Sequence, residues 1–276
     1  MIPKKIHYCW FGGAEKKELV KKCIDSWKKY CPDYEIIEWN ESNYDVYKNA
    51  YIKEAYTNKK WAFVSDFARL DIIYKEGGFY LDTDVELIRS LDPLCDKSCI
   101  LGVESTGYIN TGLGFGAEQG NKTIELMLRE YKNTHFLISP GIFHDLPCPI
   151  RNTFPFIKYG FDKSSNDIQV ILNAYIYPKE YFCPINYETK QLSITSNTFS
   201  IHHFNGTWIP KYLIEYEEFL KVNEDRKSKM YCFIYKLHLE YKSLFETFNI
   251  LNILSFMYGK IKKKLLKIKY RKYYRI

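Results

Sequence analysis

The stretch AFVSDFARLDIIYKEGGFYLDTDVEL, residues 62–87, contains the helix and the strand that decide the fold. Its apolar residues recur at helical spacing up to the stop signal Gly77-Gly78, so residues 60–78 are expected to form a helix. FYLD follows at once as a short apolar strand. A helix that passes directly into a buried strand indicates an α/β sheet protein.

The segments around this stretch extend the same pattern. KIHYCW (5–10) and YEIIEW (34–39) are expected strands, and residues 15–30 between them have helical spacing. Strand, helix and strand at this length begin a parallel sheet with a right-handed crossover. A loop-rich region with six prolines is expected between residues 134 and 200. The other expected elements are strands at 99–104, 111–117 and 199–204 and a helix at 121–133.

The strand FYLD ends in two aspartates one residue apart, Asp82 and Asp84. Residues two apart in a strand face the same way, so both carboxylates are expected at the carboxyl end of a strand, where ligands bind in α/β sheets. Two adjacent carboxylates repel each other unless a cation lies between them, and Mn²⁺ or Mg²⁺ with substrate phosphates fits such a pair. A solvated turn explains the same tripeptide equally well.

Three further groups are candidates for the same site. Asp66 and Arg69 lie three apart on one helix face shortly before the acidic strand, although a surface ion pair also explains them. His202 and His203 alternate across the last strand, so at most one of them faces a metal, and a purely structural histidine is the alternative. Trp10 falls at the carboxyl end of the first strand, where a tryptophan either stacks on a base or belongs to the core.

The 276 residues carry a formal net charge of +7, which is concentrated at the C-terminal end. The last seventeen residues, KIKKKLLKIKYRKYYRI, contain no acidic residue. An apolar stretch at 248–258 precedes them and is too short to span a bilayer. Together they predict contact with an anionic membrane surface and not with nucleic acid. A solvated helix packed on the domain is the alternative.

The cysteines and the N-terminal end indicate the compartment. Eight cysteines occur without a CxxC pair, and MIPKKIHYCWFGG has too short an apolar run for a secretory signal. We therefore expect reduced thiols in a cytoplasmic protein, held at the inner face of the plasma membrane by its basic tail.

Four motifs, taken in order, resemble glycosyltransferase family 32, the family with a sugar-binding region containing a DXD motif: IPKKIHYCWFGG, AFVSDFARLDIIYKEGGFYLDTDVEL, NTGLGFGAEQGN and SIHHFNGTW. This family includes bacterial capsular polysaccharide synthesis proteins and mannosyltransferases, and the glucosyltransferase domains of large clostridial toxins share its central block. The resemblance covers residues 2–208. It implies a GT-A fold over residues 1–210, with a Rossmann-like, mostly parallel central sheet flanked by helices. A helical basic extension is expected over residues 211–276.

The resemblance also implies roles for the matching residues. Trp10 resembles a tryptophan that stacks on the donor's uracil. Asp66 and Arg69 resemble the pair that holds the hydroxyls of the donor sugar, and Ser65 belongs to the same motif. Tyr80 is similar to a tyrosine that lines the diphosphate.

The remaining implied roles concern the metal and the leaving group. Asp82 resembles a carboxylate near the ribose and the metal, and Asp84 resembles the direct metal ligand. His203 is similar to a histidine that completes the metal site in the related family 8. The other matches are Asn110 beside the donor sugar, Trp208 at the leaving phosphate and Asp167 near the anomeric carbon.

The resemblance implies a retaining hexosyltransferase that uses Mn²⁺ or Mg²⁺ and a UDP-sugar, such as UDP-galactose or UDP-glucose. The expected acceptor is a growing surface glycan on a lipid carrier, and front-face attack is the expected route because the sequence shows no compelling nucleophile. One alternative is a metal-dependent phosphohydrolase, but that DxD motif prefers the first strand and Thr or Val where Glu86 stands. The other alternative is a non-catalytic, membrane-docking sugar-binding protein.

Overall fold

The computed structural model describes residues 1–139, 142–144, 146–186, 189 and 191–205. The chain divides into two compact units, one formed by Met1–Phe136 with Asp145–Asn205 and the other by Leu137–His144 with Gly206–Ile276. Trp208 and the expected helical extension over 211–276 lie outside the described residues. The boundary at residue 210 therefore stays a prediction.

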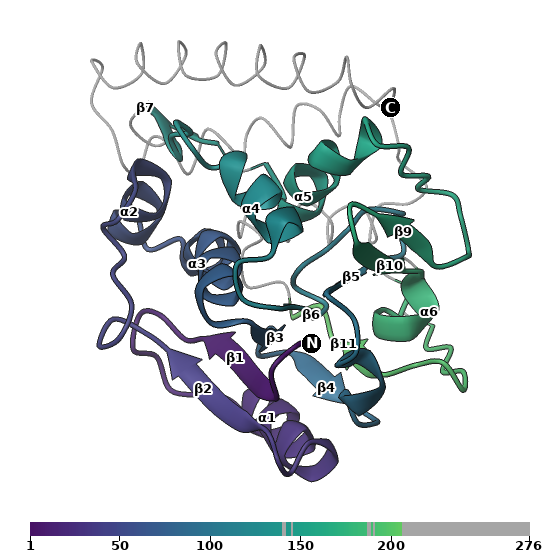
Figure 1. The fold of residues 1–276 in the computed structure, drawn as a ribbon. Coiled ribbons are helices and arrows are strands. Elements are labelled where there is room, and N and C mark those ends of the chain that lie inside the picture. The colour runs from purple at the N-terminus through teal and green to yellow at the C-terminus, as the bar shows by residue number, and fades with distance from the viewer. Residues whose placement is uncertain (140–141, 145, 187–188, 190, 206–276) are drawn as a thin grey trace, which may run out of the picture. The chain divides into compact units, whose positions relative to one another are not determined.

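A seven-stranded sheet forms the centre of the first unit (Figure 1). Five strands run in one direction, whereas β6 and β9 are antiparallel to their neighbours. The predicted α/β class with a mostly parallel central sheet is therefore confirmed. The strand order is β2 (Glu35–Trp39), β1 (Lys5–Cys9), β3 (Gly78–Tyr80), β6 (Phe115–Ala117), β5 (Cys99–Gly102), β10 (Ala174–Tyr177) and β9 (Gln169–Ile171).

Helices flank both faces of this sheet (Figure 1). On one face, α1 (Glu18–Tyr30) packs Trp27 against Tyr8 of β1, with ring centroids 5.5 Å apart. On the other face, α3 (Trp61–Glu76) contacts β1, β3 and β6. The alternation of side chains along β1 explains both contacts, because Tyr8 points to α1 whereas His7 bonds the carbonyl of Gly77 at the end of α3.

The connection from α3 to β3 positions the site. α3 ends at Glu76, and β3 begins two residues later because Gly77 and Gly78 adopt φ values of 65° and 99°. Glycine reaches these angles without steric cost. A Cβ at Gly78 would also lie 2.9 Å from the carbonyl oxygen of Lys5. The tight turn therefore sends the chain back along the helix, and the residues after β3 return to the side chains of α3.

A separate two-stranded sheet lies next to the acidic motif. β4 (Val85–Leu87) pairs with β11 (Ser200–His202) in antiparallel register, with His202 opposite Val85. α1 holds β4 in place, because the indole N–H of Trp27 donates to the carbonyl of Val85 over 2.8 Å. The strand at 199–204 was predicted from the sequence, but its partner β4 was not.

The remaining elements include several that the sequence did not indicate. Its prolines led to the prediction that residues 134–200 are loop-rich. This region nevertheless contains the helices α5 (Cys148–Ile157) and α6 (Lys179–Phe182) and the strands β9 and β10. Proline is tolerated in the first helical turn, and Pro149 occupies that place in α5. The other elements are α2 (Ala50–Thr57), α4 (Lys122–Arg129) and a 3₁₀ turn at Asp92–Leu94. In the second unit, β7 (Leu137–Ser139) and β8 (Ile142–Phe143) form a short antiparallel pair.

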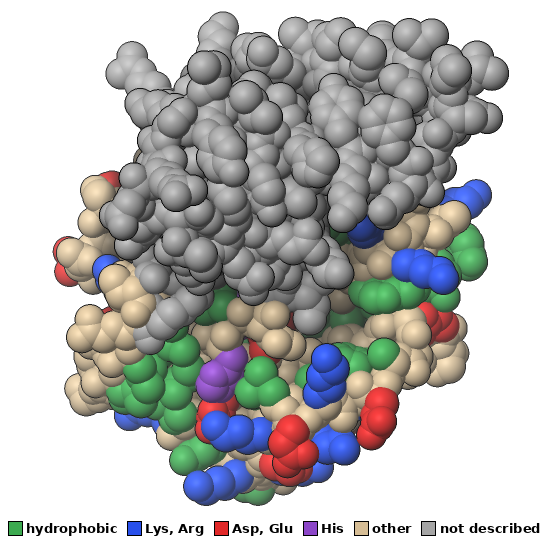
Figure 2. All heavy atoms as spheres, turned by 180° about the vertical axis from the view of Figure 1, so that it is seen from behind, with side chains coloured by type: hydrophobic (Ala, Val, Ile, Leu, Met, Phe, Trp, Pro, Cys, Tyr) green, Lys and Arg blue, Asp and Glu red, His purple; other side chains and the backbone are tan. Residues whose placement is uncertain are grey.

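The described surface carries charges of both signs. Figure 2 shows acidic and basic side chains interspersed on one face and not gathered into a patch of a single sign. Within the residues that the structure describes, no helix has the length and apolar character needed to cross a membrane.

Candidate active site

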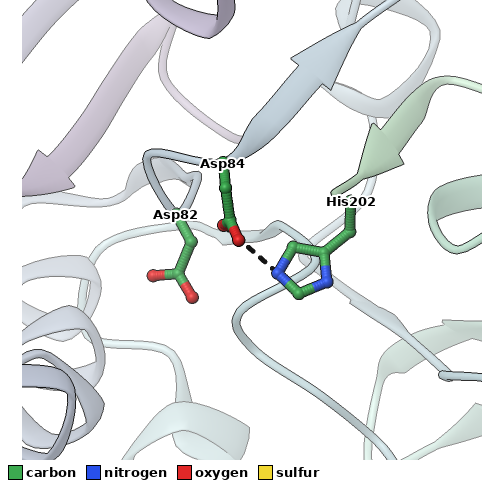
Figure 3. Close-up of side chains that lie close together, drawn as sticks. All are labelled: Asp82, Asp84 and His202. Atoms are coloured by element: carbon green, nitrogen blue, oxygen red, sulfur yellow. Dashed lines mark ion pairs between the residues drawn. The ribbon is translucent and has the colours of Figure 1, made fainter. Parts of the chain in front are cut away.

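The acidic motif lies in a turn and not in a strand. β3 ends at Tyr80 and β4 begins at Val85, and the Val85 N–H donates to the carbonyl of Asp82 over 2.9 Å. The expected alternation along a strand is therefore wrong, but the turn still directs Asp82 and Asp84 toward His202 of β11 (Figure 3). One ligand atom from each of the three residues lies within 4.8 Å of the others. This spacing suits three ligands of one cation.

The histidine of this cluster is His202, whereas the sequence favoured His203. The Nε2 atom of His202 lies 3.2 Å from Oδ1 of Asp84, and its side chain is 10% exposed. His203 points to the other face of the strand, where its Nε2 lies 2.9 Å from Oε2 of Glu86. The register of β11 on β4 decides between the two, because it places His202 opposite the residue that follows Asp84.

The charges of the cluster favour an ionised Asp84. Burial alone would raise the pKa of Asp84, but His202 and the N–H of Asn205, which is 2.9 Å from Oδ2, lower this pKa to about 2. Burial alone would likewise lower the pKa of His202, but the carboxylates of Asp84, Asp82 and Glu104 raise it. The contacts with His202 and Asn205 thus stabilise the ionised form of Asp84.

Arg69 is buried between two carboxylates. Its side chain is 4% exposed, pairs with Asp66 one turn earlier on α3, and places Nη1 3.2 Å from Oδ2 of Asp82. Tyr80 donates its hydroxyl to the other oxygen of Asp82 over 2.9 Å. Burial raises the pKa of both Asp66 and Asp82, and the charge of Arg69 opposes this rise. Asp66 and Arg69 thus form part of a buried network and not a surface ion pair.

The segment Asn110-Thr111-Gly112 closes one side of this network. Asn110 is 7% exposed, and its Oδ1 accepts the N–H of Gly112 over 2.7 Å. A Cβ at Gly112 would lie 2.6 Å from Oδ2 of Asp82 and 3.1 Å from Nη1 of Arg69. The backbone can approach the charged network this closely only at a glycine. Gly112 was not singled out from the sequence, although it is the glycine of the NTG motif that contains Asn110.

The other predicted residues lie in different surroundings. Trp10 follows β1 and donates its indole N–H to the carbonyl of Ala14 over 2.7 Å, and its side chain is partly buried. Ser65 lies on α3, where its carbonyl accepts from Nε of Arg69 over 3.2 Å. Asp167 is exposed in the loop before β9, and no interaction in the described residues joins it to the acidic cluster. The role predicted for Asp167 therefore stays a prediction.

Comparison with known proteins finds similarity in the N-terminal part of the chain. Residues 17–101 match the family described as glycosyltransferase sugar-binding region containing DXD motif. The chain is 32% identical over 126 residues to inositol phosphoceramide mannosyltransferase 3 of Schizosaccharomyces pombe, a match that covers 41% of this chain and 33% of the relative. It is 25% identical over 174 residues to inositol phosphoceramide mannosyltransferase 1 of the same organism, covering 57% and 52%. The matches thus span between a third and about half of the length of these relatives.

Two solved structures also show similarity. The PaToxG glycosyltransferase matches with a TM-score of 0.42 and 20% identity, over 57% of this chain and 69% of its own. A glycosyltransferase involved in the glycosylation of the major capsid of PBCV-1 matches with a TM-score of 0.38 and 12% identity, over 71% and 92%. Residues 17–101 are thus similar to the sugar-binding region of the DXD glycosyltransferases, as the sequence motifs predicted.

Proposed function

We propose that the protein is a metal-dependent glycosyltransferase with a GT-A fold, which moves a hexose from a nucleoside diphosphate sugar to an acceptor hydroxyl. One observation carries the proposal: Asp82 belongs both to the cluster with Asp84 and His202 and to the buried network with Arg69 and Asp66. A diphosphate requires a cation, and a sugar requires groups that bond its hydroxyls. The two kinds of group meet at this one aspartate.

The cluster fits a divalent cation. It offers two carboxylates and one imidazole, and the imidazole turns Nε2 toward the carboxylates, 3.2 Å from Oδ1 of Asp84. Carboxylates suit Mg²⁺ and Mn²⁺, and the imidazole favours Mn²⁺ of these two. When bound, such a cation supplies a Lewis acid that neutralises the charge developing on the departing diphosphate.

The buried network fits the hexose. The carboxylate of Asp66 accepts hydrogen bonds, whereas the guanidinium of Arg69 donates them, so together they recognise a hydroxyl that does both. A sugar without the matching hydroxyl leaves buried charged groups unpaired, and this makes the network selective. Tyr80 is 1% exposed and bonds Asp82, so we infer that it holds Asp82 in place and does not touch the diphosphate itself.

The partners of the carboxylates favour front-face attack with retention. Asp66 and Asp82 bond Arg69, and Asp84 pairs with His202. A carboxylate engaged in this way is a poor nucleophile, which disfavours a covalent glycosyl-enzyme. In the proposed reaction the bond from the anomeric carbon to the diphosphate breaks, the acceptor oxygen bonds that carbon on the same face, and the acceptor proton passes to the departing phosphate oxygen.

The donor and the acceptor are proposed from the resemblance, the relatives and the tail. The family resemblance suggests UDP-glucose or UDP-galactose, while the curated relatives are mannosyltransferases and add GDP-mannose. The relatives are named for inositol phosphoceramide, a lipid, and residues 260–276 are rich in lysine and arginine. Both features support a lipid-linked glycan acceptor, such as a capsule repeat. They also support a cytoplasmic protein that binds the inner face of the plasma membrane.

Donor hydrolysis tests the activity. The purified protein should slowly hydrolyse UDP-glucose, UDP-galactose or GDP-mannose in Mn²⁺, and Asp84→Asn should reduce this turnover by at least about 100-fold. Asp25→Asn is the control, because Asp25 is exposed on α1 and pairs only with Lys28 in the described residues. Equal turnover in Asp84→Asn and wild type would contradict the cation site. If wild type neither turns over nor binds these donors in Mn²⁺, the proposed activity is wrong.

Vesicle binding tests the proposed membrane contact. The full chain should sediment with phosphatidylserine vesicles at low salt, and a chain ending at residue 246 should not. Equal sedimentation of both proteins would refute a role for the tail.

A further inference from the structure

The segment that follows β11 holds Asp84 at two points. His203 donates its backbone N–H to the carbonyl of Asp84 over 3.0 Å. Two residues later, Asn205 donates its N–H to the side chain of the same aspartate, 2.9 Å from Oδ2. Residues 203–205 therefore fix both the backbone and the carboxylate of a residue that belongs to the cation cluster.

A turn at Phe204 allows the second of these contacts. If β11 continued in register with β4, Asn205 would lie opposite Asp82. Phe204 interrupts the strand, because its φ of 50° lies in the left-handed region. The chain turns there, and the N–H of Asn205 reaches Oδ2 of Asp84 instead. The conformation of one residue thus decides which aspartate this N–H bonds.

The left-handed conformation is unfavourable for phenylalanine. A Cβ crowds the backbone in this region, so glycine and asparagine adopt it far more readily than a bulky residue. Asn133 and Asn173 are examples in this chain. Strained residues persist where the surroundings impose them, and they gather at sites that bind ligands. A phenylalanine at a position that suits asparagine therefore indicates a use for its ring.

The ring of Phe204 packs against the imidazole of His202. The two rings meet edge to face, with centroids 4.3 Å apart and an angle of 72° between their planes. Phe204 is itself partly buried against the apolar core. A metal-bound histidine ordinarily donates its second ring N–H to a carboxylate or a carbonyl, which fixes the ring. Nδ1 of His202 is buried and has no hydrogen-bond partner among the described residues, so packing must hold Nε2 toward Asp84 (Figure 3).

We propose that Phe204 is a positioning residue of the cation site: its backbone turns the N–H of Asn205 onto Asp84, and its ring holds the imidazole of His202 toward the same carboxylate. The inference rests on the proposed function, because it takes Asp84 and His202 as ligands of a divalent cation. Phe204 needs no contact with the cation. Ligands that are already held in place lose less conformational freedom when they bind, so Phe204 raises the affinity of the cluster for the cation.

The Mn²⁺ affinity of three variants of the full chain tests the two parts of this role. Phe204→Tyr keeps the ring and should bind Mn²⁺ within about threefold of wild type. Phe204→Gly keeps the turn without the ring and should bind about tenfold more weakly. Phe204→Val should bind at least about tenfold more weakly, because a β-branched residue disfavours the left-handed turn. Wild-type affinity in Phe204→Gly, or equal losses in Phe204→Gly and Phe204→Tyr, would overturn the role of the ring.

Leu172→Gly is the matched control. Leu172 also has a left-handed backbone, with a φ of 52°, and it precedes the amino end of β10. β10 runs parallel to β5 and to β3, so this turn lies at the edge of the sheet opposite the acidic motif. The control removes an apolar side chain and backbone strain in the same way as Phe204→Gly, and it should bind Mn²⁺ as wild type does.

A spectroscopic readout follows the histidine directly. Pulsed paramagnetic resonance of bound Mn²⁺ detects coupling to an imidazole nitrogen. The coupling should be present in wild type and Phe204→Tyr, absent in His202→Ala, and weaker in Phe204→Gly at saturating Mn²⁺. Coupling of wild-type strength in Phe204→Gly would show that the ring does not position His202, even if the affinity falls.

Nuclear magnetic resonance of the metal-free protein separates this inference from the proposed activity. The order parameter of the imidazole C–H groups of His202 should fall in Phe204→Gly and stay in Phe204→Tyr. The backbone amide signal of Asn205 should shift in Asp84→Asn and in Phe204→Val. If neither the order parameter nor the amide signal changes in the Phe204 variants, the inference is wrong. A wild type that does not bind Mn²⁺ contradicts the proposed cation site, and the metal-free signals then decide whether Phe204 positions the two side chains.

Discussion

Replacing Gly112 with alanine is expected to damage the site while preserving the fold. The φ of Gly112 is not among the positive values, so alanine can adopt its backbone conformation. The obstacle is steric: the new methyl group would lie 2.6 Å from Oδ2 of Asp82, 3.0 Å from Oδ1 of Asn110 and 3.1 Å from Nη1 of Arg69. Ordinary contacts begin near 3.4 Å, so the carboxylate must withdraw by about 0.8 Å, the difference between 3.4 and 2.6 Å.

This displacement sets the expected size of the effect. Misplacing a catalytic group by about 1 Å lowers the rate on the order of 100-fold. Overpacking a buried position costs about 1–3 kcal/mol of stability. Because Asp82 belongs to the cation cluster as well as to the Arg69 network, Gly112→Ala should also weaken Mn²⁺ binding.

The assay compares Gly112→Ala with Gly120→Ala. Gly120 has a φ of 71° and no atom within 4 Å of an added Cβ, so alanine there strains the backbone by about 1–2 kcal/mol without touching the site. Thermal unfolding should show similar losses of stability in both variants. Donor hydrolysis in Mn²⁺ should fall about 100-fold in Gly112→Ala and less than about threefold in Gly120→Ala. A folded Gly112→Ala protein with nearly wild-type hydrolysis would refute the reasoning.

Two further predictions concern histidines. His202→Ala should weaken Mn²⁺ binding at least about tenfold, whereas His203→Ala should weaken it less than about threefold. The paramagnetic resonance signal of free Mn²⁺ measures both affinities. A larger loss in His203→Ala would identify His203 as the ligand. His7 is fully buried, and burial lowers its pKa from 6.5 to about 4 despite its bond to Gly77. Between these values the unfolded chain binds more protons, so stability should fall by up to about 3 kcal/mol as the pH drops from 6.5 to 4. Urea unfolding of wild type and His7→Gln across this pH range measures the effect. If the free energy of unfolding changes equally with pH in both proteins, the lowered pKa of His7 is contradicted.

Elements set by local periodicity are predictable from this sequence. The helix expected at 60–78 is α3 at Trp61–Glu76, and the strand expected at 5–10 is β1 at Lys5–Cys9. In both, the apolar spacing within one segment indicates the type of element, although the fold buries each of them on more than one face. β10 and α5 were not predicted, because prolines lie beside or within them. Whether a proline ends an element or is tolerated in it depends on its position there.

The same physical distinction separates the site residues. Asp66, Arg69 and Asp82 come together through one helix and one tight turn, so their proximity follows from a segment of 17 residues, 66 to 82. The choice between His202 and His203 depends on how β11 aligns with β4, more than 110 positions earlier in the chain. A shift of one residue in that alignment exchanges the faces of the two histidines. Alternation within the strand limits the answer to one of them, but only pairing with β4 selects His202.

Separation along the chain is not by itself the limit. Phe204 is two residues from His202, yet the sequence does not show their contact, because it depends on a left-handed turn that the bond from Asn205 to Asp84 closes. Gly112 belongs to the same NTG motif as Asn110, but a glycine can serve many purposes. The need for glycine becomes clear only in the fold, where an added Cβ would lie 2.6 Å from Oδ2 of Asp82. The sequence thus reveals the residues that carry charge at a regular spacing. The residues that orient them are defined by contacts between segments, and these require the folded chain.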